Sequence, residues 1–234
     1  MKAIFKKEFD NYFNSPIGYI FIGIFIAIAS FFFTQRVVLV GKASMANVFS
    51  DINFVYLFLA ALLTMRLLSE EKNKKTDQLL LSAPVSITEI VLGKYFAALA
   101  VFGLTMLLSA IYPIILFTYA NPSIGEMISS YVGFILLWSS FIAIGLFISS
   151  LTESQMIAGV LTFAVLIAIN YAQSIKLFTD NVIVVGIFNA ISLFSHYDVF
   201  QTGVISIKEV VYYISVSAAF IFLTVRVMDR RRFS

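Results

Sequence analysis

The run from Tyr95 to Gly125, YFAALAVFGLTMLLSAIYPIILFTYANPSIG, contains 31 consecutive residues without a charged side chain. A helix that crosses the roughly 30 Å hydrocarbon core of a bilayer needs about 20 apolar residues. The run is therefore long enough to span a membrane, and Asn121-Pro122 near its end is a typical turn signal. We expect one transmembrane helix that ends near Ala120 and is kinked at Pro113.

The rest of the chain has the same apolar character. Of its 234 residues, 60% are hydrophobic and only 12% are charged, with a mean hydropathy of +0.96. Soluble domains carry about a quarter of charged residues, so this composition excludes a soluble enzyme and a disordered chain. The absence of cysteine and the presence of a single histidine, His196, argue against a disulfide framework, a metal site and a Ser–His catalytic relay. We expect an integral membrane protein without catalytic or metal-binding residues.

Five further charge-poor windows complete the predicted plan. We expect an all-α polytopic membrane protein with six transmembrane helices, forming a single transmembrane domain over residues 1–234. Because six is an even number of crossings, both ends of the chain then lie on the same side of the membrane. The five additional predicted spans are Ile17–Gln35, Ala46–Leu68, Met127–Thr152, Ser154–Gln173 and Val210–Val225.

The basic residues predict which side that is. With the N-terminus inside, 12 of the 16 lysines and arginines fall in inner segments and only 4 in outer ones. Cytoplasmic loops are the ones enriched in Lys and Arg, so we expect both termini in the cytoplasm. The cluster Arg230–Arg232 is then an anchor attracted to anionic lipid of the inner leaflet.

The first 15 residues predict a helix that lies in the membrane interface. Met1, Ile4, Phe5, Phe9, Tyr12 and Phe13 fall along one side at helical spacing, and the opposite side carries lysines. Glu8 interrupts the edge of the apolar arc. Aromatic side chains opposite lysines are typical of interfacial helices. The alternative is an amphipathic lead-in that only assists membrane insertion.

The cytoplasmic loop from Arg66 to Lys94 is the most informative polar segment. It contains a predicted short helix that Thr76 caps and Pro84 ends, and the sequence Ser86-Ile-Thr-Glu89 is a capping box for the next span. Three successive leucines in this helix need a place to be buried, either in a groove on a cytoplasmic partner or on the lipid interface. The helix comprises Thr76, Asp77, Gln78, Leu79, Leu80, Leu81, Ser82 and Ala83.

The outer segment 174–208 predicts a re-entrant or interfacial helical pair. Asn181 to Ser195 lacks charged residues, yet it is too short to cross a bilayer and too apolar to face water. His196 and Asp198 follow it. These two residues are candidates for an outer gate, as a substrate contact or a latch, and the alternative is local hydrogen bonding that fixes the turn.

The positions of the charged residues also indicate which energy source the protein could use for transport. No ionisable residue lies in the middle of a predicted span, which disfavours a proton-driven transporter. The chain contains no G-x-x-x-x-G-K-[ST] string, so it does not bind ATP through a P-loop of its own. If the protein moves a substrate uphill, the energy has to come from a separate subunit.

Three stretches resemble one known family, the ABC-2 type permeases. These permeases commonly show an acidic pair, a glycine-threonine pair, a leucine run, Pro-Val-Ser and Ile-Val-Leu-Gly-Lys. Here Lys75 stands where glycine is usual and Gln78 where glutamate is usual. The matching runs are Arg66-Leu-Leu-Ser-Glu-Glu71, Thr76-Asp-Gln-Leu-Leu-Leu-Ser-Ala-Pro-Val-Ser86 and Glu89-Ile-Val-Leu-Gly-Lys94.

The resemblance implies a permease subunit of an ATP-driven exporter in the bacterial cytoplasmic (inner) membrane. It implies that Thr76–Ala83 is a coupling helix that docks on a separate ATPase subunit, which holds ATP and Mg²⁺, with Glu70, Glu71 and Lys94 near the junction. It also implies a second permease chain, identical or related. The stretch Ser192–Ile205 is similar to the permease associated with bacterial gliding motility.

Two other classes of function remain open from the residues alone. One is a membrane anchor or assembly component of a complex that transports nothing. The other is an ATP-independent channel or carrier. Contact of the loop leucines with an ATPase distinguishes the permease from both.

Overall fold

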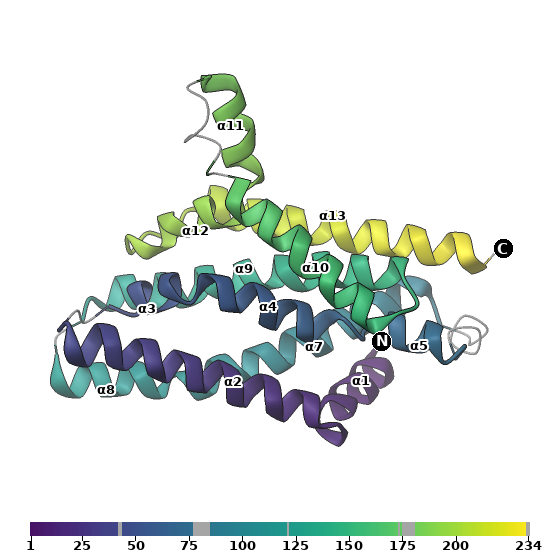
Figure 1. The fold of residues 1–234 in the computed structure, drawn as a ribbon, viewed down its shortest axis with the longest axis horizontal. Coiled ribbons are helices and arrows are strands. Elements are labelled where there is room, and N and C mark those ends of the chain that lie inside the picture. Colours follow the sequence, from purple (N-terminus) through teal and green to yellow (C-terminus); the bar gives the residue numbers. More distant parts are fainter. Residues whose placement is uncertain (42–43, 77–84, 121, 173, 175–180, 233–234) are drawn as a thin grey trace.

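The computed structural model describes residues 1–41, 44–76, 85–120, 122–172, 174 and 181–232, and these residues form helices and no strands. The helices pack side by side into an elongated bundle (Figure 1). In chain order they are α1 (Lys2–Asn14), α2 (Pro16–Phe33), the π-helix η1 (Thr34–Leu39), α3 (Met45–Asp51), α4 (Asn53–Thr64), α5 (Ser69–Asn73), α7 (Ile87–Ser109), α8 (Ile111–Tyr119), α9 (Ile124–Leu151), α10 (Gln155–Asn170), α11 (Val182–Ile191), α12 (Leu193–Gln201) and α13 (Ile207–Arg232).

Four predicted spans are confirmed as helices that are long and apolar enough to cross a membrane. In chain order, they correspond to the first, third, fourth and sixth of the six predicted spans. The third helical segment ends at Tyr119 with Ala120 as its C-cap, and it breaks at Ala110, three residues before the proline where we expected the kink. The four segments are Pro16–Leu39, Ile87–Tyr119, Ile124–Leu151 and Ile207–Arg230.

The prediction of a continuous second span is wrong. The structure divides it into α3 and α4, which are bent by 71° relative to each other. The bend directly follows Asp51, whose carboxylate forms an ion pair with Arg36 of η1. A charged pair is favoured near the polar end of a membrane helix rather than at its centre, so the Arg36–Asp51 pair marks the bend as the polar end of α4.

The region of the fifth predicted span forms an apolar helix that is shorter than expected. The helix α10 has 16 residues, about 24 Å at 1.5 Å per residue, which is less than the bilayer core. The helix α12 begins beside its end, where the Ser192 hydroxyl donates to the carbonyl of Asn170 over 3.3 Å. The predicted outer helical pair is also present as α11 and α12, bent by 78°, and α11 projects from the side of the bundle (Figure 1).

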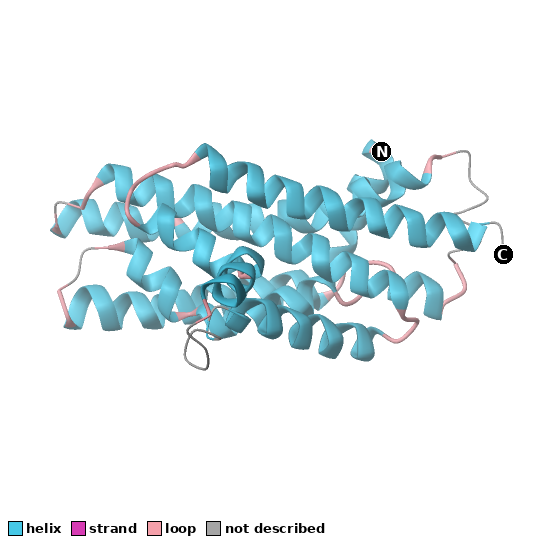
Figure 2. Cartoon of the chain, turned by 90° about the horizontal axis from the view of Figure 1, so that it is seen from above, coloured by secondary structure: helices cyan, strands magenta, loops and turns pink. Residues whose placement is uncertain are grey.

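The described residues contain four helices long enough to cross a membrane, or up to six if each bent pair is one span. The two chain ends lie at the same end of the bundle (Figures 1 and 2), as an even number of crossings requires. The helices α1 and α5 and the beginning of α7 lie at this end as well. The connections from η1 to α3, from α8 to α9 and from α12 to α13 lie at the opposite end.

The core is an aromatic cluster centred on Trp138 of α9, which is the most buried of the four long helices. Phe102 of α7 stacks on the Trp138 ring at 4.3 Å, and Phe25 of α2 and Tyr56 of α4 pack against it at 6.2 and 6.1 Å. Such ring pairs add stability beyond their buried area. One side chain therefore holds α2, α4 and α7 around α9.

Glycine allows α4 to approach α9 closely. A Cβ atom on Gly145 would lie 2.1 Å from the Thr64 Oγ1 atom and 2.6 Å from its Cβ atom. In contrast, a Cβ atom on Gly23 of α2 would meet nothing within 4 Å.

We predict opposite effects for two alanine substitutions. Gly145→Ala should destabilise the purified protein by about 1–3 kcal/mol, because α4 and α9 have to move apart. Gly23→Ala should leave stability unchanged or raise it by up to about 1 kcal/mol, since alanine favours helix. Thermal unfolding followed by size-exclusion chromatography in detergent measures both. Equal melting of the two variants would contradict the close α4–α9 packing.

Candidate functional site

The most buried charge in the described chain is Lys94, near the beginning of α7. The helix starts with the predicted capping box, in which the Ser86 hydroxyl accepts from the Glu89 backbone and the Glu89 side chain accepts from the Ser86 backbone. The Lys94 side chain is only 1% exposed. Its ammonium group lies 3.0 Å from a carboxylate oxygen of Glu8 and 3.0 Å from one of Glu71. Lys94 therefore joins α7 to α1 and α5, and two carboxylates compensate its charge.

Glu8 explains the interruption in the apolar face of the N-terminal helix. Its side chain turns towards Lys94 and is 12% exposed. The helix can approach because a Cβ atom on Gly93 would lie 2.9 Å from a methyl carbon of Ile4. The Tyr12 hydroxyl, which is buried, donates to the Leu63 carbonyl over 2.8 Å. The predicted N-terminal helix is thus confirmed as a helix, and its apolar side packs on the bundle.

Two acidic residues of α5 have different partners. Glu71 binds Lys94, whereas Glu70 accepts from the Arg66 Nε atom at 2.8 Å and from Lys74 at 2.7 Å. Burial alone would raise the pKa of Glu70, but the hydrogen bond with Lys74 and the charge of Arg66 outweigh it and hold the pKa below its usual value. Arg66 also donates to the Ser15 hydroxyl over 3.0 Å. This second set of pairs links α5 to the turn between α1 and α2.

The end of α9 holds the loop from the opposite side. The Ser149 hydroxyl accepts from the backbone N–H groups of Leu68 and Ser69, each over 3.0 Å. The buried Lys72 ammonium donates to the Ser150 carbonyl. As a result, the segment between α4 and Lys74 is attached to α1, α7 and α9.

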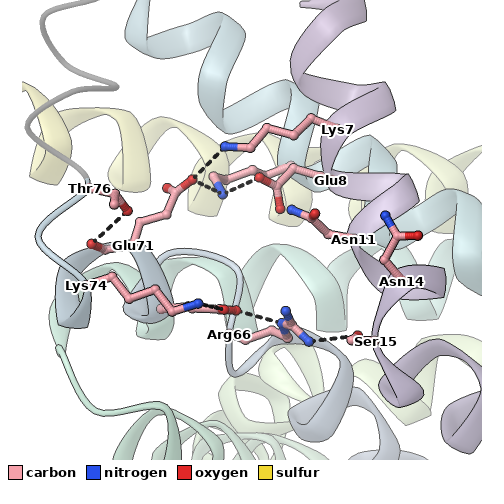
Figure 3. A pocket seen from close by; sticks show the side chains of 11 residues that line it. Lys7, Glu8, Asn11, Asn14, Ser15, Arg66, Glu71, Lys74 and Thr76 are labelled. Carbon is pink, nitrogen blue, oxygen red and sulfur yellow. Dashed lines mark hydrogen bonds and ion pairs between the residues drawn. The ribbon is translucent and has the colours of Figure 1, made fainter.

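A polar pocket of about 360 Å³ lies between these elements. Figure 3 shows side chains from α1, α5 and α7 around it, joined by the ion pairs described above. Its residues are all polar, and they are Lys7, Glu8, Asn11, Asn14, Ser15, Arg66, Glu70, Glu71, Lys74, Thr76 and Lys94.

Thr76, the first residue of the predicted coupling helix, is the last residue that the structure describes before residue 85. Thr76 lies at the edge of the pocket, and its backbone N–H donates to the Glu71 carbonyl over 2.9 Å. Lys75 has a φ of 55°, in the left-handed region that favours glycine, which explains why glycine is usual at this position of the motif. Residues 77–84, and with them the rest of the predicted helix, lie outside the described residues.

The two candidates for an outer gate, His196 and Asp198, both lie in α12 and have different partners. The His196 Nδ1 atom contacts the buried carboxylate of Glu209 in α13, and its ring stacks on Tyr212 at 3.8 Å. Asp198 instead accepts from Gln201 over 3.2 Å at an exposed position. The partner of His196 therefore lies thirteen residues further along the chain, in the next helix.

Helices of this length and hydropathy, with a polar junction at one end, define a multi-span membrane protein. The model of a family described as ABC-2 family transporter protein matches residues 2–228. Because this match covers nearly the whole chain, the protein belongs to the ABC-2 family of transporter proteins, and it is a membrane permease component of an ABC transporter. No curated protein matches the chain.

The sequence motifs point to Glu70, Glu71 and Lys94, and all three line the polar pocket. Glu8, Ser149 and Lys72 were not predicted. Glu8 could have been predicted from the sequence, since a carboxylate on the apolar side of a helix needs a cation as its partner. Ser149 and Lys72 had no such signal, because their contacts depend on how α5 meets α9.

We predict that Lys94→Met destabilises the protein strongly. The variant leaves two largely buried carboxylates without their cation, a change that costs about 3–5 kcal/mol in other buried pairs. Lys74→Met is the matched control, because its side chain is 63% exposed and its partner Glu70 keeps Arg66. Thermal unfolding in detergent should show a loss for Lys94→Met of about 10 °C. If the two variants melted together, Lys94 would not be the link among the three helices.

Proposed function

We propose that this chain is the transmembrane subunit of an ATP-driven exporter, moved by a separate ATPase that docks on residues 76–83. The observation that carries the proposal is the Lys94 junction. The segment that leads into the docking residues is attached by buried polar contacts to α1, α7 and α9. A displacement of the docking residues would therefore pull on helices that run the length of the bundle.

The proposed mechanism is mechanical and involves no covalent chemistry on this chain. ATP and Mg²⁺ bind to the ATPase, and closure of two ATPase subunits moves the docking helices. Two permease chains, identical or related, then switch their shared pathway from one side of the membrane to the other. A largely buried ion pair suits this role, because separating it is costly and the joined helices move together.

The membrane assignment follows from the same arrangement. The junction, both chain ends and Arg66, Lys72 and Lys74 lie at one end of the bundle. We place this end in the cytoplasm of a bacterial cell, where an ATPase can reach residues 76–83, and the protein in the inner membrane. The likeness of Ser192–Ile205 to the gliding-motility permease supports a transporter that serves motility.

We assign the outer gate to His196 and Glu209, with Asp198 outside it. The pair ties α12 to α13, and Tyr212 extends the tie because its hydroxyl donates to the Ile191 carbonyl at the end of α11 over 3.3 Å. An ionisable pair within the bundle is a typical functional element of a membrane protein. Opening of the outer side would separate α12 from α13 and break this pair.

We predict that Leu80→Glu abolishes association with the ATPase. A carboxylate cannot be buried in an apolar docking contact without a cost of several kcal/mol. Gln78→Glu is the matched control, because it adds the same charge in the same segment and keeps the leucines. The measurement is purification of each tagged variant from its native cells in mild detergent, with mass spectrometry of the co-purifying proteins.

An ATPase that is recovered with the wild-type chain and Gln78→Glu, and lost with Leu80→Glu, would support the proposal. Equal recovery with all three would show that the ATPase docks elsewhere. If no ATPase were recovered under conditions that preserve other membrane complexes, an anchoring role or an ATP-independent channel would be the better explanation.

We predict that His196→Gln and Glu209→Gln each loosen the outer end of α12. A single cysteine at position 202, in a chain that has no native cysteine, should react about tenfold faster with an impermeant maleimide, the factor expected for losing one hydrogen bond to a charged group. Asp198→Asn should leave the rate unchanged. An equal effect of Asp198→Asn would show that Asp198 belongs to the gate as well. No effect of His196→Gln and Glu209→Gln would show that this pair does not hold α12 in place.

A further inference from the structure

A groove lies along the last turns of α13 where it passes the end of α9. Its volume is about 770 Å³, and it lies apart from the Lys94 junction, with which it shares no residue. It is lined by Phe147, Leu223, Arg226, Val227, Asp229 and Arg230.

The groove is apolar along one part and basic along the other. Leu223 and Val227 of α13 and Phe147 of α9 form its apolar part. Arg226 and Arg230 are four residues apart, so they project from the same face of the helix, one turn above the other, and both are exposed. The Arg226 guanidinium lies over the Phe222 ring, 5.1 Å from its centroid, in a cation–π contact that leaves the side chain exposed.

The charges in the groove do not cancel. Within the described part of the chain, neither Arg226 nor Arg230 forms a salt bridge, and Asp229 is the acidic residue that lines the groove. Two arginines and one aspartate leave one net positive charge. A ligand that complements the groove therefore carries one net negative charge next to a hydrocarbon portion.

The position of the groove indicates which class of molecule it binds. The last turns of α13 lie at the same end of the bundle as the two chain ends (Figures 1 and 2), where the apolar surface of a membrane protein meets the headgroups. There, the molecule with a phosphate beside a long hydrocarbon chain is a phospholipid. Two guanidinium groups one helical turn apart match a phosphodiester, which accepts several hydrogen bonds from arginine.

We propose that this groove is a binding site for an anionic phospholipid. The phosphate lies between Arg226 and Arg230, and an acyl chain lies along Leu223, Val227 and Phe147. Asp229 opposes the bound anion and sets the affinity below its maximum. The inference does not depend on ATPase docking, because none of its residues belongs to the junction.

The test is native mass spectrometry of the full chain in detergent, titrated with phosphatidylglycerol or with phosphatidylcholine of the same acyl chains. Wild type should retain phosphatidylglycerol in preference. Arg226→Gln and Arg230→Gln should each weaken phosphatidylglycerol binding about fivefold, the factor expected for one basic residue at an anionic membrane surface. Asp229→Asn should strengthen binding, because it removes the one negative charge in the groove.

Lys208→Gln is the control. It also removes one positive charge from α13, but at the other end of the helix, where the Lys208 side chain is 83% exposed. It should bind phosphatidylglycerol as wild type does. The site would be refuted if both arginine variants bound as wild type, if Lys208→Gln weakened binding equally, or if phosphatidylcholine bound as well. If an arginine variant failed to fold, Asp229→Asn would still decide the question through its preference for phosphatidylglycerol over phosphatidylcholine. Loss of structure exposes apolar surface to both lipids and does not raise this preference.

Discussion

The arrangement at one end of this protein depends on the ammonium group of Lys94. A lysine that is 1% exposed is tolerated only when carboxylates surround it, and these come from α1 and α5, which are far apart in the sequence. The ion pairs therefore oblige three segments to meet at one point. Gly93 permits the meeting, because a side chain there would hold α1 away from α7. This end of the permease is therefore firmly attached to the rest of the bundle.

The aromatic core explains how a movement at that end can reach the rest of the bundle. Trp138 contacts rings from α2, α4 and α7, so these helices share one packed centre with α9. Because Gly145 lies in close contact with Thr64, α4 and α9 are closely packed. Because packed interiors resist gradual deformation, helices joined in this way shift as units. The loop at the junction is attached to the last turn of α9, which connects it to the same centre.

The segment around α11 follows a different rule, which is that every backbone polar group in an apolar surrounding needs a partner. The helix α11 is apolar and projects from the bundle, and its ends are satisfied within the chain. The Asn181 side chain accepts from the N–H groups of Ile183 and Val184, and the Tyr212 hydroxyl donates to the Ile191 carbonyl. Ser195 likewise donates to the carbonyl of Asn189 over 2.8 Å. The segment is thus prepared for a membrane environment, although it is too short to cross one.

The sequence by itself determined the class of protein, four of the spans and the start of α7 at Ser86. These features depend on hydropathy and on neighbours along the chain, which a sequence records directly. Only the tertiary structure decided that Glu8 binds Lys94, that His196 binds Glu209 and that the second span bends after Asp51. The physical reason is the same in each case. A charged side chain selects its partner by position in space, and that position is set by how helices distant in the sequence pack together.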